Sequence, residues 1–93
     1  MIMRESHIEK YLKARVEGEG GLYRRLKWQG RRGAPDDLVC LNGAHFTECK
    51  APGKPLQPHQ EREHTRMRSQ GIHVWVLDSY ASVDRFITWA LRQ

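Results

Sequence analysis

The segment Gly33–Lys50, GAPDDLVCLNGAHFTECK, holds two short β-prone runs on either side of Asn42-Gly43. Asn-Gly between such runs is a strong signal for a β-hairpin, because both turn positions favour a positive φ. Side chains alternate along a strand, so Glu48 and Lys50 should point to the same face. An aspartate from the first strand can meet Glu48 across the ladder. Two carboxylates and a lysine on one edge of a hairpin form a site for a hard divalent cation.

The register of the hairpin decides which aspartate faces Glu48. A strict two-residue turn pairs Leu41 with Ala44 and places Asp37 opposite Glu48. A three-residue loop or a bulge shifts the pairing and brings Asp36 there instead. Turn geometry slightly favours Asp37, and the spacing alone leaves both aspartates open.

Several short motifs follow one another along nearly the whole chain. In order, they are Gly33-Ala34-Pro35-Asp36, Glu48-Cys49-Lys50, Lys50-Ala51-Pro52, Leu56 with Gln60, and Gly71-Ile72-His73-Val74. Together they resemble the VRR-NUC domain family of the PD-(D/E)xK nuclease superfamily, of the stand-alone type found in phages and bacteria. Pro-Asp or Glu-x-Lys alone would be a weak signal, whereas the ordered set is fairly specific.

This resemblance implies a fold and an activity. The fold would be α/β, with a restriction-endonuclease-like small mixed sheet flanked by helices. The activity would be that of a metal-dependent DNA endonuclease that hydrolyses phosphodiester bonds in branched DNA, such as four-way (Holliday) junctions. Members of this kind usually act as homodimers, because symmetric cuts in two strands need two sites related by a two-fold axis.

The resemblance also assigns metal ligands. Asp36 and Glu48 would bind Mg²⁺ or Mn²⁺, for which oxygen ligands are suited. The backbone carbonyl of Cys49 and the carboxylate of Glu5 would complete or brace the ligand shell. Glu5 best matches the glutamate that the family carries on its first helix, and Glu9 is its competitor. A glutamate in that position is otherwise explained by the helix macrodipole.

Two further side chains receive roles in this way. Lys50 would orient the attacking water and stabilise the extra negative charge of the transition state. Gln60, near the start of a helix, could hydrogen-bond a site water or Lys50. The bound metal would polarise the scissile phosphate.

The charge of the chain fits a polyanionic partner. Sixteen Lys and Arg residues stand against 11 Asp and Glu residues, giving a net charge of +5. A basic stretch without acids is interleaved with Tyr23 and Trp28, a pattern typical of nucleic-acid binding. The expected DNA-binding residues are Arg24, Arg25, Lys27, Arg31, Arg32 and Lys54. The competing interpretation is a strand edge protected by charges.

The remaining pattern predicts one domain over residues 1–93, in the order α-β-β-β-α-β-α. The expected elements are a helix over about 6–16, a strand over 22–28, the hairpin, a helix over 58–70, a strand over 72–77 and a helix over 80–91. The strand over 72–77 is apolar on both faces, which favours a central place in the sheet.

Composition bounds the location and the alternatives. No run approaches the ~20 apolar residues of a membrane span, and the N-terminus has no signal-peptide pattern, so we expect a soluble cytoplasmic protein without membrane contact. Cys40 and Cys49 are expected to be free thiols. A zinc site from these cysteines with some of His45, His59 and His64 is a weak alternative, since no Cys-x-x-Cys spacing is present. A non-catalytic nucleic-acid-binding module is the main rival to the nuclease, and a sequence-reading restriction enzyme ranks lower.

Overall fold

The structure is a computed structural model that describes residues 2–93. Its elements follow the predicted order α-β-β-β-α-β-α. They are α1 (Glu5–Gly18), β1 (Leu22–Arg25), β2 (Asp37–Cys40), β3 (Ala44–Cys49), α2 (Pro58–Ser69), β4 (Val74–Leu77) and α3 (Tyr80–Leu91). No helix within residues 2–93 is long and apolar enough to cross a membrane.

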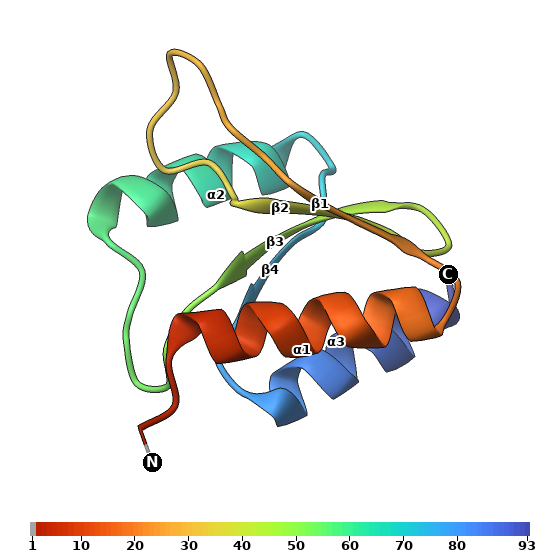
Figure 1. The fold of residues 1–93 in the computed structure, drawn as a ribbon. Coiled ribbons are helices and arrows are strands. Elements are labelled where there is room, and N and C mark those ends of the chain that lie inside the picture. The colour runs from red at the N-terminus through yellow and green to blue at the C-terminus, as the bar shows by residue number, and fades with distance from the viewer. Residues whose placement is uncertain (1) are drawn as a thin grey trace.

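The elements form three layers, with the sheet in the middle. Figure 1 shows α1 and α3 side by side on one face of the sheet, and α2 on the opposite face. The apolar stripes of α1 and α3 explain this arrangement, because their apolar residues recur at helical spacing and must be covered. The fully buried side chains of these two helices are Ile8, Leu12, Val16, Val83, Phe86, Ile87 and Ala90. The hydrophobic core therefore lies on the α1–α3 face.

The sheet is mixed and runs in the order β1-β2-β3-β4. The first three strands are antiparallel, and β4 is parallel to β3. The predicted central position of the last strand is wrong, since β4 forms an edge. It is apolar on both faces because α2 contacts one face and α3 the other. At its free edge, Arg68 Nε and one Nη donate to the carbonyl oxygen of Val74 at 3.1 and 2.7 Å, which protects the edge.

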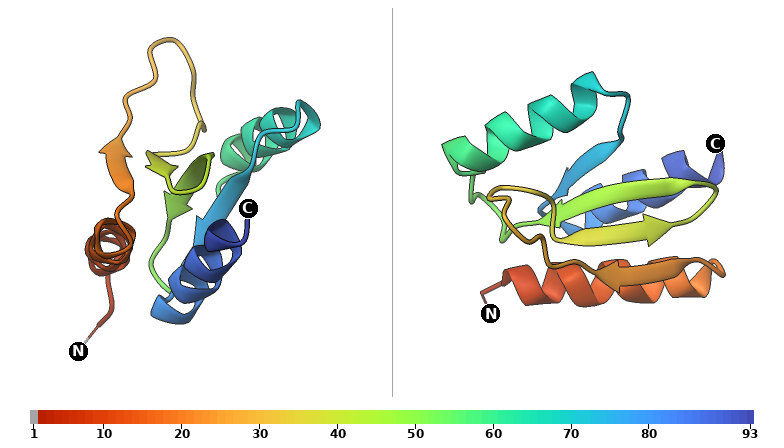
Figure 2. Two further views of the ribbon diagram at one scale, coloured as in Figure 1. Left: turned by 90° about the vertical axis from the view of Figure 1, so that its right-hand side faces the viewer. Right: turned by 90° about the horizontal axis from the view of Figure 1, so that it is seen from above.

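The first strand is shorter than predicted. It ends at Arg25, and only the bond from Leu26 N to Asp36 O, 2.7 Å long, continues toward the loop. Figure 2 shows this loop, which joins β1 to β2, rising away from the sheet. The alternation of side chains that predicted a strand up to Trp28 therefore extends beyond the residues that pair with β2.

The hairpin has a three-residue loop. Cys40 pairs with Ala44, although Asn42 (φ 49°) and Gly43 (φ 123°) hold the positive φ values expected of Asn-Gly. The same register pairs Asp37 with Thr47. One step further along both strands, Asp36 lies across from Glu48. The turn-based preference for Asp37 is therefore wrong.

Burial explains why this register is preferred. A shift of one residue would turn one strand over and exchange its two faces. In the observed register, Val39 and Cys49 are fully buried, both on the α1–α3 side of the sheet. The alternative would place Glu48 in that apolar core.

Gly33 fixes the end of the β1–β2 loop against α2. It has φ +82°, and a Cβ at this position would lie 2.5 Å from the carbonyl oxygen of His59. We expect Gly33→Ala to destabilise the protein by about 1–3 kcal/mol and to displace the loop that carries Asp36. Chemical denaturation and a DNA-cleavage assay measure the two effects.

Gly30 provides the matched control in the same loop. It also has a positive φ, of +69°, but a Cβ there meets nothing within 4 Å. Gly30→Ala should therefore cost only the backbone preference, about 1 kcal/mol. Equal losses of stability and cleavage in the two variants would contradict the packing role of Gly33.

Candidate active site

Glu48 lies in β3 on the face that α2 covers. It is only 2% exposed, and its Oε1 is 3.6 Å from Nε2 of His64 in α2. Asp36 is half-buried and lies directly before β2, within hydrogen-bonding reach of Glu48. The loop and the hairpin together bring two carboxyl groups onto one side of the sheet.

The surroundings raise the pKa of Glu48 to about 9. Burial is the largest cause, followed by the hydrogen bond with Asp36 and the Asp36 charge. Lys50 opposes the shift, and Glu5 adds to it. These four side chains therefore share one electrostatic environment, and a strongly shifted carboxyl beside a partner charge is typical of functional sites.

Glu5 and Lys50 line a common hollow. Its volume is about 530 Å³, and Lys54 and Gln57 also contribute to its wall. The pKa of Glu5 is raised by burial, by its contact and charge interaction with Glu9 and by the charge of Asp36, and it is lowered by Lys50. The first turn of α1 thus brings a third carboxylate toward the pair formed by Asp36 and Glu48.

Glu9 contacts Glu5 and also extends to Arg25. Its carboxylate is 2.6 Å from Nη1 of Arg25, whose Nε is 3.2 Å from the fully buried Asp37. Asp37 also lies 3.9 Å from the thiol of Cys49. Burial raises the pKa of Asp37 to about 6, against the opposing effects of Tyr23 and Arg25. This network lies on the α1–α3 side of the sheet. Its contacts explain Asp37 and Arg25 as residues that stabilise the fold.

Lys50 and Gln60, the two other predicted site residues, have defined positions in the structure. The backbone N of Lys50 donates to Leu77 O at 2.9 Å, so the sheet fixes the origin of the lysine side chain. Gln60 Oε1 accepts a hydrogen bond of 2.9 Å from Gln57 N, which closes the first turn of α2. In this arrangement Gln60 caps a helix, and a contact with Lys50 remains a prediction.

The predicted DNA-binding residues divide into two groups. Arg25 is held by Glu9 and Asp37, and Arg31 Nη1 lies 3.7 Å from the buried Glu63. The exposed residues of the set, apart from these two, are Arg24, Lys27, Arg32 and Lys54. Arg24 Nη1 donates to the carbonyl oxygen of Tyr23. The basic loop is therefore attached to α2 through Glu63 and still presents positive charge to solvent.

The carboxylates fit a cation that needs few protein ligands. Within residues 2–93, no group of three or more His, Cys, Asp or Glu side chains is arranged to hold a metal ion. This also gives no support to the zinc alternative. Mg²⁺ commonly uses one or two carboxylates together with water and substrate phosphates. Asp36 and Glu48 supply such a pair. Among residues 2–93, Glu48 Oε1 has no hydrogen-bond partner, and a bound cation would favour the ionised form of this carboxyl, whose pKa is raised.

Sequence reasoning missed two buried residues of α2. Glu63 is 8% and His64 0% exposed, whereas the sequence named His64 only in the weak zinc alternative and Glu63 not at all. Glu63 contacts Arg31 and Arg66, whereas His64 faces Glu48. A usable signal was present, because His64 follows Gln60 by four residues and so shares its face of the helix.

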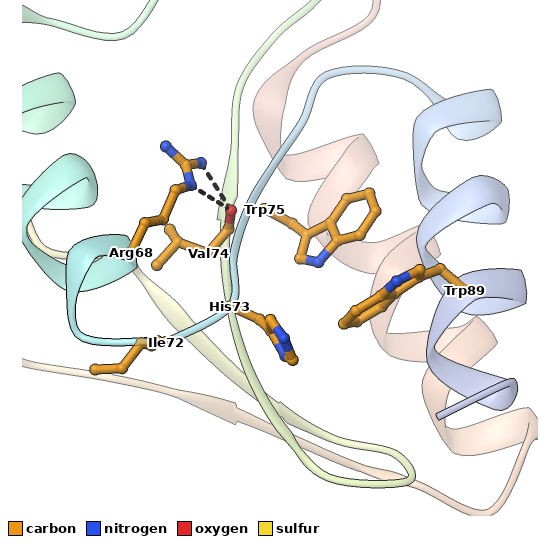
Figure 3. A pocket seen from close by; sticks show the side chains of 7 residues that line it. Arg68, Ile72, His73, Val74, Trp75 and Trp89 are labelled. Atoms are coloured by element: carbon orange, nitrogen blue, oxygen red, sulfur yellow. Dashed lines mark hydrogen bonds between the residues drawn. The ribbon is translucent and has the colours of Figure 1, made fainter.

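A second concavity lies away from the carboxylates. Figure 3 shows it between β4 and α3, where the rings of His73, Trp75 and Trp89 gather, with Arg68 reaching over from α2. Its volume is about 380 Å³, and no acidic side chain lines it. It is therefore not a place for a divalent cation.

The raised pKa of Glu48 predicts how stability depends on pH without metal. Between the unfolded pKa of about 4.5 and the folded pKa of about 9, the folded protein holds one more proton than the unfolded chain. The free energy of unfolding should therefore fall as pH rises from about 7 to 8.5, by up to about 1.4 kcal/mol per pH unit. Asp37, with a pKa of about 6, is already mostly ionised there.

Glu48→Gln should remove most of this fall. Denaturation in EDTA at several pH values measures it, and saturating Mg²⁺ should flatten the wild-type curve, since a bound cation favours the ionised carboxylate. An equally steep fall in Glu48→Gln would assign the effect to other groups.

Comparisons with known proteins find two relatives of the chain. No protein-family profile matches the chain. The chain is 49% identical over 80 residues to "Putative nuclease p44" of Acyrthosiphon pisum secondary endosymbiont phage 1, covering 84% of this chain and 86% of that protein. A solved structure described as "VRR_NUC domain" is similar with a TM-score of 0.83 and 43% identity, over 92% of this chain and 96% of that one.

Proposed function

This chain belongs to the VRR_NUC family of nucleases, and from that membership we propose that it is a divalent-metal-dependent endodeoxyribonuclease acting on branched DNA. Four-way junctions are the proposed substrate, with residues 1–93 acting as one nuclease domain. The observation that carries the proposal is the half-buried Asp36 next to the buried Glu48, beside Lys50. Because the substrate is DNA, we place the activity in the cytoplasm of a bacterial or phage-infected cell.

Asp36 and Glu48 would hold Mg²⁺ or Mn²⁺, with Glu5 and the carbonyl of Cys49 as additional oxygen donors. When bound, the cation supplies Lewis-acid polarisation of the scissile phosphate. Glu5 faces the same hollow as Lys50, whereas Glu9 pairs with Arg25, which supports Glu5 over Glu9.

Lys50 would orient the attacking water and stabilise negative charge that develops on the phosphate oxygens. Its charge opposes the rise in the pKa values of Glu48 and Glu5, which supports a place for Lys50 beside the carboxylates. Gln60, with its amide nitrogen, would hold a water in the site.

We further propose that two copies act together, because paired cuts in a junction need two sites. The aromatic concavity around Trp75 and Trp89, at the free edge of β4, is the proposed surface for a second copy. The molar mass in solution tests this, and a mass of one chain at micromolar concentration counts against it.

The test of function compares cleavage of a labelled four-way junction, a splayed fork and a linear duplex in Mg²⁺, Mn²⁺ or EDTA. Cleavage that needs metal and prefers the junction is expected. Cleavage of all three DNAs at one rate would remove the branched-DNA assignment. Binding without cleavage under every metal would favour the non-catalytic module.

The basic loop should contribute to DNA affinity without sequence preference. Arg31→Ala with Arg32→Ala should weaken binding to every DNA and reduce the slope of log K against log salt by about 1–2. The reduction should lie nearer 1, because Arg31 is already compensated by Glu63. Fluorescence anisotropy over a salt series measures the slope.

Lys13→Ala is the matched control. Lys13 is an exposed cation of α1, on the opposite side of the sheet from α2, and it pairs with Glu17 at 3.8 Å. Its removal should leave the slope unchanged. A slope that responds equally to both variants would indicate a general charge effect instead of contacts from the loop.

A further inference from the structure

His64 faces Glu48 with both groups incompletely bonded. The imidazole is fully buried, and its Nε2 is 3.6 Å from Glu48 Oε1. Among residues 2–93, neither of these two atoms has a hydrogen-bond partner, and neither does His64 Nδ1. Buried polar atoms are seldom left without partners, so this pairing of unsatisfied atoms calls for a reason.

The two groups are chemically complementary. A neutral imidazole offers one N–H donor, and an ionised carboxylate only accepts. The observed separation exceeds the usual 2.7–3.2 Å of such a bond, and a shift of less than about 1 Å closes it.

We propose that His64 positions Glu48, donating a hydrogen bond from Nε2 to Oε1 so that the other carboxylate oxygen is directed at the divalent cation. The proposal rests on the proposed function. It gives α2 a role at the site, because the helix holds the imidazole over β3. Partners of ligating groups act in this way when they orient a ligand and favour its charged form.

The same arrangement predicts opposite effects on metal binding and on stability. Without metal, His64 contributes buried, unpaired nitrogens, whose desolvation opposes folding. Leucine has a similar volume and no polar atom. His64→Leu should therefore unfold at the same temperature as the wild type in EDTA, or higher, while it binds metal more weakly.

The experiment titrates Mg²⁺, Mn²⁺ and Ca²⁺ into DNA-free protein by calorimetry. His64→Leu should raise Kd by about 10–100-fold for all three ions. His64→Gln, whose amide can place a donor near the position of Nε2, should recover most of the affinity. At saturating Mg²⁺, His64→Leu should cleave DNA within about threefold of the wild-type kcat.

Three results would overturn the positioning role. The positioning role is excluded if a folded His64→Leu variant binds the metal ions with wild-type affinity. If the leucine variant does not fold, His64→Met serves for the same measurement. Weakened Mn²⁺ binding with unchanged Ca²⁺ binding would make His64 a direct ligand, since imidazole suits Mn²⁺ better than Ca²⁺. A wild type that binds none of the three ions contradicts the metal site itself, and with it the proposed function.

Discussion

Lys50→Ala is expected to reduce the rate of DNA cleavage by at least about 10³-fold. A single group that stabilises transition-state charge is commonly worth 10²–10³, and Lys50 would also orient the attacking water. The hollow that it shares with Glu5 is open to solvent, so a water molecule can replace the ammonium group but not its charge. Single-turnover cleavage of a junction at saturating enzyme measures the loss directly.

The same variant should keep its fold and its DNA affinity. The backbone of Lys50 is held by Leu77 O and does not depend on the side chain. DNA affinity should stay within about threefold, because many other cations contribute to phosphate binding. Metal affinity should fall slightly, since the lysine charge favours the ionised form of Glu48.

Lys54→Ala is the matched control for this prediction. Lys54 lines the same hollow four residues further along the chain. Its removal should raise KM and leave kcat nearly unchanged, as expected for uniform binding. If Lys54→Ala lost as much kcat as Lys50→Ala, or if Lys50→Ala kept a tenth of the wild-type rate, the assignment of Lys50 would be wrong.

Local patterns in the sequence identified the elements but not all of their neighbours. The helix of residues 80–91 was predicted correctly because its apolar stripe and the Ser79 cap are local signals, and Ser79 Oγ does accept from Ser82 N. The strand before it was placed centrally because its residues are apolar on both faces. Coverage by α2 and α3 produces the same pattern at an edge.

The candidate site also contains features that local sequence patterns could not predict. Asn42-Gly43 predicted the turn, but the length of the loop depends on which residues the helices bury. Arg25 belonged to a basic stretch in the sequence, yet the structure pairs it with acids from two different elements. The sequence named His64 only in the weak zinc alternative, because its place beside Glu48 depends on a distant strand. Tertiary contacts, which a one-dimensional pattern does not contain, decide each of these cases.

The adjacent pair Asp36 and Asp37 offers the sharpest test of the register. Asp36→Asn should lower cleavage by at least about 10³-fold and weaken metal binding, because it removes one of two carboxylate ligands. In EDTA at about pH 9 and above, where Glu48 is ionised, the same variant should unfold at a higher temperature than the wild type. The reason is that the charge of Asp36 disfavours the ionised form of Glu48 without metal.

Asp37→Asn should behave in the opposite way. Its carboxylate is fully buried and lies 3.2 Å from Nε of Arg25, so an amide there weakens a buried charge interaction. The free energy of unfolding should fall by about 1–3 kcal/mol, while cleavage at saturating Mg²⁺ stays within about tenfold of wild type. Both variants are measured by denaturation in EDTA and by cleavage assays. Asp36→Asn should lose cleavage and keep stability, whereas Asp37→Asn should lose stability and keep most of its cleavage.

Loss of cleavage in Asp37→Asn with retention in Asp36→Asn would mean that the two-residue turn register is populated in the active enzyme. The carboxylate site would then have to be rebuilt around Asp37, on the face that α1 and α3 cover.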